Sequence, residues 1–123
     1  MPAENYNIDK KSEDFAVRIV NLYKYLTLSA ATKEFVISKQ LLRSGTSVGA
    51  NVAESKFAQS TADFMSKYRI ALKEANESEY WLRLLLRTDY ITETEYKSLF
   101  KDCDELVKIL VTIIKRLEQN SKK

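Results

Sequence analysis

The sequence predicts an all-α protein, an up-down-up-down antiparallel four-helix bundle, on three observations. Residues that punctuate turns are scarce: the 123 residues include two Gly and one Pro, where an average chain of this length carries about fifteen. Four stretches place apolar residues at the three- and four-residue spacings of amphipathic helices. The connections between these stretches are about three to six residues long, so consecutive helices are expected to be antiparallel neighbours.

Residues 1–123 are expected to form one domain, because a domain typically contains about 150 residues. Residues 1–8 and 120–123 are expected to be frayed tails. The first helix is predicted from Ser12 to about Ser29, with Asp9 or Ser12 as its N-cap. Its apolar face consists of Phe15, Ile19, Leu22 and Leu26.

The second helix is predicted from about Thr32 to Lys56, with Phe35 and Ile37 among its apolar residues. Gly45 and Gly49 are its weak points, because each glycine costs about 1 kcal/mol relative to alanine in a helix interior.

The third helix is predicted from near Ser60 to about Thr88, and Asp63 stands three residues after Ser60 in a capping-box-like arrangement. Thr92 and Glu95 form a clearer capping box and open the fourth helix. The fourth helix has an apolar seam that is typical of a bundle, made of Leu99, Cys103, Leu106, Leu110, Ile113 and Leu117. We expect Cys103 to be a core residue, since a buried thiol behaves as a small hydrophobe.

The second helix also carries a polar stripe at the spacing of an apolar seam. It consists of Gln40, Ser44, Ser47, Asn51 and Glu54, with Gly45 and Gly49 beside it. Such glycines let another backbone or side chain approach closely. An ordinary solvated face would instead be rich in Lys and Glu, so we expect something to pack against this stripe.

Glu74, Glu77 and Trp81 are successive neighbours on one face of the third helix. A buried or half-buried polar contact of Asn51 and Glu54 with residues near Glu74 and Glu77 would explain both unusual faces. The alternative is that both glutamates are solvated and only Trp81 is buried.

Two segments resemble signatures of a known family, the small bacterial four-helix proteins named for genes in intervening sequences of 23S ribosomal RNA. Ser38 to Glu54 resembles the central signature, in which a Gln, an Arg, a Ser, an Asn and an Ala-Glu recur, and Arg69 to Leu82 resembles the second. The chain departs from many members at Ser55-Lys56, where a Gly often stands.

The resemblance implies a ring-shaped homopentamer and no established enzyme activity. It also implies kinship with a basic pentameric bundle that binds nucleic acid together with a reverse transcriptase. The first functional hypothesis is therefore an oligomeric scaffold that binds RNA or ribonucleoprotein weakly and without base specificity. The proposed phosphate contacts are Arg43, Arg69, Lys73 and Arg83. Five chains of net charge +3 would carry about +15, enough for binding through counterion release. The alternative is that these cations pair with nearby carboxylates.

A second hypothesis is a protein-interaction module without nucleic acid, in which a partner helix docks in the small-residue groove of Gly45, Ser47, Gly49 and Asn51. The alternative is that this groove forms part of the interface between subunits. A third hypothesis is an enzyme or metal carrier that uses Glu54, Glu74 and Glu77, because carboxylates can hold a hard divalent ion.

Composition argues against that third hypothesis. The chain has no His and one Cys, which excludes a Ser-His-Asp relay, a His metal site and an intrachain disulfide. No apolar run approaches the about 18 residues needed to span a bilayer. We therefore expect a cytoplasmic, non-catalytic protein without a cofactor or a membrane partner.

Overall fold

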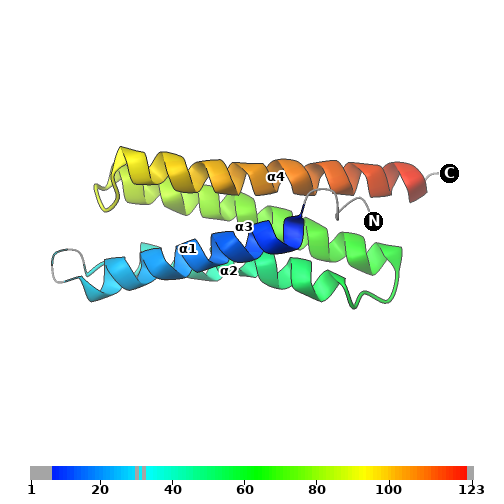
Figure 1. The fold of residues 1–123 in the computed structure, drawn as a ribbon, viewed down its shortest axis with the longest axis horizontal. Coiled ribbons are helices and arrows are strands. Elements are labelled where there is room, and N and C mark those ends of the chain that lie inside the picture. Colours follow the sequence, from blue (N-terminus) through cyan, green and yellow to red (C-terminus); the bar gives the residue numbers. More distant parts are fainter. Residues whose placement is uncertain (1–6, 30, 32, 122–123) are drawn as a thin grey trace.

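The computed structural model describes residues 7–29, 31 and 33–121, and these residues form four α-helices and no strand. The helices are α1 (Ile8–Leu28), α2 (Ile37–Ser55), α3 (Thr61–Arg87) and α4 (Glu93–Ser121). They lie lengthwise beside one another as a bundle, and α4 lies along α3 (Figure 1). The predicted all-α bundle is confirmed.

Contacts between the helices give their directions. Gly45 lies against Ile19 and Gly49 against Ser12, so α2 runs antiparallel to α1. In the same way α2 and α3 are antiparallel, because the contacts Ser44–Ser78 and Glu54–Lys67 run in opposite directions along the two helices. Two further pairs, Ala75–Cys103 and Arg69–Glu118, make α4 antiparallel to α3.

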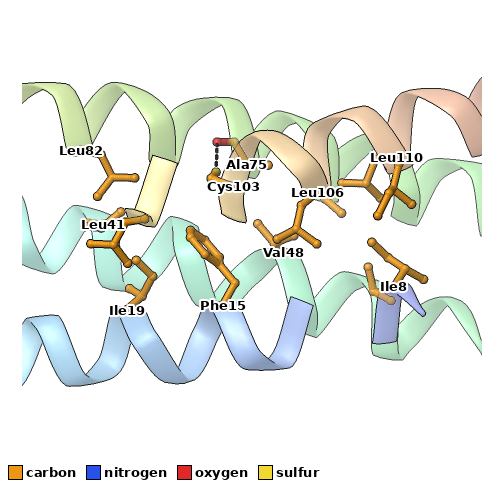
Figure 2. Close-up of a cluster of buried hydrophobic side chains, with 14 of the residues drawn as sticks. Ile8, Phe15, Ile19, Leu41, Val48, Ala75, Leu82, Cys103, Leu106 and Leu110 are labelled. Carbon is orange, nitrogen blue, oxygen red and sulfur yellow. Dashed lines mark hydrogen bonds between the residues drawn. The ribbon is translucent and has the colours of Figure 1, made fainter. Parts of the chain in front are cut away.

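The core lies where the apolar faces of the four helices meet (Figure 2). Its members include Phe15 and Ile19 of α1, Leu41 and Val48 of α2, Leu82 of α3, and Leu106 and Leu110 of α4, each at most 1% exposed. Burial of one such side chain contributes about 1.5–3 kcal/mol.

Cys103 belongs to this core, as expected. Its thiol donates a hydrogen bond to the Ala75 carbonyl oxygen at 3.2 Å. Burial first, and then the neighbouring carboxylates of Glu79, Asp104 and Asp102, raise the pKa of Cys103.

The first helix begins earlier than predicted. Ile8 is its first residue and is 1% exposed, because it completes the apolar face at this end of the core. Asn7 precedes it at a φ of 53° and makes no side-chain cap. Ser12 is buried inside the helix and donates to the Asp9 carbonyl oxygen at 3.2 Å, so the prediction of Asp9 or Ser12 as N-cap is wrong.

Both predicted tails are too long where the structure describes them. Ile8 is a core residue, and Asn120 belongs to α4. Residues 1–6, 122 and 123 lie outside the described residues.

The second helix begins at Ile37, later than predicted, because Glu34 acts as its cap. The Glu34 carboxylate accepts hydrogen bonds from the backbone N–H groups of Val36 (3.0 Å), Ile37 (3.0 Å) and Ser38 (2.6 Å). Phe35 lies in the connection and is exposed. The connection from α1 to α2 is therefore longer than expected. Thr32, the predicted start of this helix, lies outside the described residues.

The predicted Ser60 cap of α3 and the predicted Thr92–Glu95 capping box of α4 are confirmed. Ser60 Oγ accepts from the Asp63 N–H at 3.1 Å. Thr92 Oγ1 accepts from the Glu95 N–H at 3.1 Å, and Glu95 Oε1 accepts from the Thr92 N–H at 2.8 Å. Each side chain satisfies a donor that the first helical turn leaves without a partner.

Candidate nucleic-acid interface

Small residues let α2 approach α3 closely. Ala71 and Ala75 of α3 are fully buried, and Ser44 Oγ of α2 lies 2.8 Å from Ser78 Oγ of α3. Ser78 also donates to the Glu74 carbonyl oxygen at 2.9 Å. This buried hydroxyl pair satisfies two polar groups that would otherwise be costly in the core, and it fixes which face of α3 is turned outward.

A charged network covers the α2–α3 seam. Arg43 pairs with Glu74 at 3.0 Å (Nη1 to Oε2) and, through its second terminal nitrogen, with Glu77. Trp81 Nε1 donates to Glu77 Oε2 at 2.9 Å. Glu74 is 8% exposed, so Arg43 neutralises a carboxylate that has little access to water. Arg43, predicted as a phosphate contact, already has two carboxylate partners.

This network supports a prediction about stability. The Arg43→Ala variant is expected to lose about 1 kcal/mol of unfolding free energy, because Glu74 keeps its burial and loses its cation. Chemical denaturation measures the loss. The control is Lys10→Ala, since Lys10 and Asp14 form an exposed ion pair and such a pair contributes little. Equal losses in the two variants would contradict the structural role of Arg43.

The predicted contact of Asn51 and Glu54 with residues near Glu74 and Glu77 is wrong. Asn51 Nδ2 donates within its own helix, to the Ser47 carbonyl oxygen at 2.9 Å and to Ser47 Oγ at 3.3 Å. Glu54 pairs with Lys67 at 3.2 Å. At the other end of the stripe, Gln40 is exposed. Of the five stripe residues, Ser44 is buried against α3.

The two glycines beside the stripe face α1 of the same chain. A Cβ on Gly45 would lie 2.9 Å from Ile19 Cγ1, and a Cβ on Gly49 would lie 3.2 Å from the Ser12 carbonyl oxygen. The close approach expected at these glycines therefore exists inside the bundle. On the side of its two glycines, the predicted docking groove is therefore occupied by α1. A partner helix cannot pack against the glycines from that side.

The three carboxylates of the metal hypothesis do not converge. Glu54 pairs with Lys67, while Glu74 and Glu77 share Arg43. Among the described residues, no group of three or more Cys, Asp or Glu side chains is placed to hold a metal ion.

The outer face of α3 presents a basic stripe, which we call the α3 stripe. Its residues repeat at a 4-3-4-3-4 spacing and are all exposed: Arg69, Lys73, Asn76, Tyr80, Arg83 and Arg87. None is acidic, and the stripe extends from Arg69 to Arg87, or about 27 Å of helix. It unites three of the four predicted phosphate contacts and adds Arg87, which the spacing from Arg83 could have revealed.

The cations of the α3 stripe differ in their surroundings. Arg69 pairs with Glu118 of α4 at 2.7 Å. The guanidinium of Arg83 lies 5.9 Å from the ring centroid of Tyr80, within cation–π range. Burial and then Asp104 raise the pKa of Glu79, and Arg83 opposes them. Lys73 and Arg87 have no ion pair within the described part of the chain, so their charges are open to an anionic ligand.

Four antiparallel helices, close packing through small residues and a basic outer face define a small helical-bundle protein. None of these helices is both long and apolar enough to cross a membrane. The chain belongs to the family of 23S rRNA-intervening sequence proteins, whose pattern it matches over residues 4–112.

A solved structure from Bacteroides thetaiotaomicron is similar to this chain. It is described as a protein of unknown function from the S23 ribosomal protein family. The two are 57% identical, the match covers 94% of this chain and 99% of the other, and the TM-score is 0.87. No protein with a curated description matches the chain.

Proposed function

We propose that this protein is a non-catalytic, self-assembling scaffold of the cytoplasm that binds RNA through the α3 stripe. The observation that carries the proposal is the exposed row that Lys73, Asn76, Tyr80, Arg83 and Arg87 form along one face of α3, in which no member is acidic. A helix face of this kind can follow a phosphate backbone, and an exposed aromatic ring offers a surface on which a base can stack.

The chemistry of the stripe favours binding without base specificity. Lys and Arg contacts to phosphates supply affinity but read no sequence. Tyr80 is 47% exposed, and stacking on its ring tolerates any base. The family resemblance adds a ring of five chains, which would present the stripe five times and raise the net charge from +3 per chain to about +15.

The test of RNA binding uses a triple variant, Lys73→Glu/Arg83→Glu/Arg87→Glu. The wild-type protein is expected to bind a fluorescent single-stranded RNA at 50 mM salt and to lose affinity steeply by about 200 mM. Each lost phosphate contact reduces the slope of log K against log salt by about 0.7, so the triple variant should have a slope smaller by about 2. Fluorescence anisotropy over a salt series measures both.

The matched control is Lys97→Glu/Lys101→Glu/Lys108→Glu, which makes the same change of net charge on exposed positions of α4. It should retain a larger salt slope than the α3 variant. Equal losses would show that net charge alone drives binding, and no binding by the wild type at 50 mM salt would overturn the proposal. Light scattering after size exclusion, with the 260/280 nm ratio of the same peak, reports the number of chains and any copurified RNA.

A further inference from the structure

Large apolar side chains are exposed at the end of the bundle where α1 ends and α2 begins. Four of the described hydrophobic residues that are exposed lie there: Tyr25 (55%), Leu28 (78%), Phe35 (54%) and Val36 (73%). The Glu34 N–H donates to the Leu26 carbonyl oxygen at 2.8 Å, which holds the connection against the end of α1. Exposed apolar side chains that gather in one region indicate an interaction site.

Three exposed lysines flank these apolar residues: Lys24, Lys33 and Lys39. None of the three has an ion pair within the described part of the chain. Between Asn21 and Gln40 the one acidic residue is Glu34, and its buried carboxylate accepts hydrogen bonds from backbone N–H groups of α2. The surface that this end presents to solvent is therefore both apolar and positively charged. We call the four apolar residues and the three lysines the α1–α2 tip.

We propose that the α1–α2 tip docks on the surface of an anionic lipid bilayer. In this arrangement Leu28, Phe35 and Val36 enter the boundary between the headgroups and the acyl chains. Tyr25 lies at the level of the headgroups, where both its ring and its hydroxyl find suitable surroundings. The three lysines rest their aliphatic stems on the same boundary and place their ammonium groups among the anionic headgroups. The expectation of no membrane partner rests on the lack of a spanning segment, and a peripheral contact does not need one.

The composition of the tip favours lipid over RNA and over a second copy of this chain. Leu28 and Val36, the two most exposed of its apolar residues, are aliphatic, so they offer no ring on which a base could stack. A second copy that met the tip with its own tip would bring lysines toward lysines, and like charges disfavour such a contact. An anionic bilayer complements both the apolar residues and the lysines.

Acidic residues near the same end of the bundle set the orientation of the contact. The α3–α4 connection and the start of α4 carry Asp89, Glu93 and Glu95, which are all exposed, and an anionic surface repels them. In Figure 1, α1 and α2 lie on one side of the bundle and α4 lies on the other. The molecule should therefore approach the bilayer at a tilt, with its α1–α2 side toward the lipid.

A single tip should bind weakly. Each lysine at an anionic surface strengthens binding about fivefold, and the small apolar contact adds a limited amount. A cyclic ring of five chains would present five equivalent tips at one level, so that binding would be multivalent and tighter. The contact does not depend on RNA binding, because it uses no residue of the α3 stripe.

Cosedimentation of the full chain with lipid vesicles tests the contact. The wild type is expected to bind vesicles in which about a third of the lipid is phosphatidylglycerol, and to show little binding to vesicles of phosphatidylcholine alone. Lys24→Gln/Lys33→Gln/Lys39→Gln should weaken binding to the anionic vesicles roughly a hundredfold, at about fivefold for each lysine. Leu28→Ser/Val36→Ser should weaken it about tenfold, because it removes apolar contact without changing the charge.

Matched controls make the same changes elsewhere on the molecule. Lys101→Gln/Lys108→Gln/Lys115→Gln removes three exposed lysines of α4, and Val17→Ser/Phe57→Ser removes two exposed apolar side chains outside the tip. Each control should bind the anionic vesicles within about twofold of the wild type at about 0.1 M salt, where charges farther than about 10 Å from the surface are largely screened. All of the changed side chains are exposed, so circular dichroism should show an unchanged fold in every variant.

The proposal is overturned if the wild type does not bind the anionic vesicles, or if the tip variants and the controls lose binding equally. Tip variants that bind vesicles normally but lose affinity for RNA in the anisotropy assay would instead assign the tip to the RNA surface. A smaller number of associated chains in the tip variants, measured without lipid, would assign it to a contact between copies of this chain. Vesicle binding and RNA binding are measured separately, so either proposal can fail while the other stands.

Discussion

The Gly45→Leu variant is expected to lose about 2–3 kcal/mol of unfolding free energy. Even a Cβ at this position would lie 2.9 Å from Ile19 Cγ1 and 3.0 Å from Ile19 Cγ2. Ile19 is 1% exposed and packed in the core, so it has little room to move. The added side chain must separate α1 from α2, and the roughly 1 kcal/mol gained in helix propensity does not offset that loss. Denaturant unfolding of the purified protein measures the change.

Ala50→Leu is the matched control, because Ala50 lies in the same helix and is exposed. Its unfolding free energy should change by no more than about 0.5 kcal/mol. If Gly45→Leu kept its stability but altered the number of associated chains, the glycine would face another copy of the protein. Such a result would contradict the close approach of α1 and α2 within one chain.

The elements that sequence predicts best are those fixed by nearby residues. The starts of α3 and α4 agree with prediction because each capping bond joins residues three positions apart. The start of α2 does not agree with prediction. Phe35 and Ile37 are both apolar and were both assigned to the helix, although α2 begins between them, at Ile37. Periodicity cannot show that the Glu34 side chain takes the backbone donors of that turn and ends the connection there.

The candidate site was predictable in part for a related reason. Lys73 and Arg83 lie on the outer face of α3, as a helical period places them. Arg43 has partners 31 and 34 residues away, and no local pattern reveals how α2 is rotated against α3. The polar stripe of α2 and its two glycines are unusual enough to be noticed in the sequence. The sequence does not show that the glycines contact α1 whereas Ser44 contacts α3, because that division depends on tertiary packing.

Glu34 is a buried carboxylate at the start of α2, and its replacement is expected to change stability by a large amount. Glu34 is only 7% exposed, and burial by itself raises the pKa of a carboxyl group because it disfavours the charged form. The backbone N–H groups of Ser38, Ile37 and Val36 and the Ser38 hydroxyl outweigh that burial and hold the pKa of Glu34 below its ordinary value of 4.5. The ionised form is therefore favoured by folding.

The Glu34→Gln variant is expected to lose about 2 kcal/mol of unfolding free energy at pH 7, since a neutral amide accepts the backbone donors of α2 less strongly than a carboxylate. The lowered pKa fixes the direction of the pH dependence. Above pH 4.5 the wild type has the full stabilisation from Glu34, and it loses that stabilisation as the pH falls through the folded-state pKa. Urea unfolding of both proteins between pH 7 and pH 2.5 measures the difference.

The two stability curves should converge at low pH, because a protonated Glu34 and a glutamine are both neutral and nearly identical in shape. Comparing the curves isolates this one carboxyl group from every other acid-sensitive group in the chain, since those groups are shared. Glu95→Gln, at the exposed capping box of α4, should cost less at pH 7 because water can replace its lost bond. A gap between wild type and Glu34→Gln that stayed constant down to pH 2.5 would mean that shape rather than charge makes Glu34 the cap of α2.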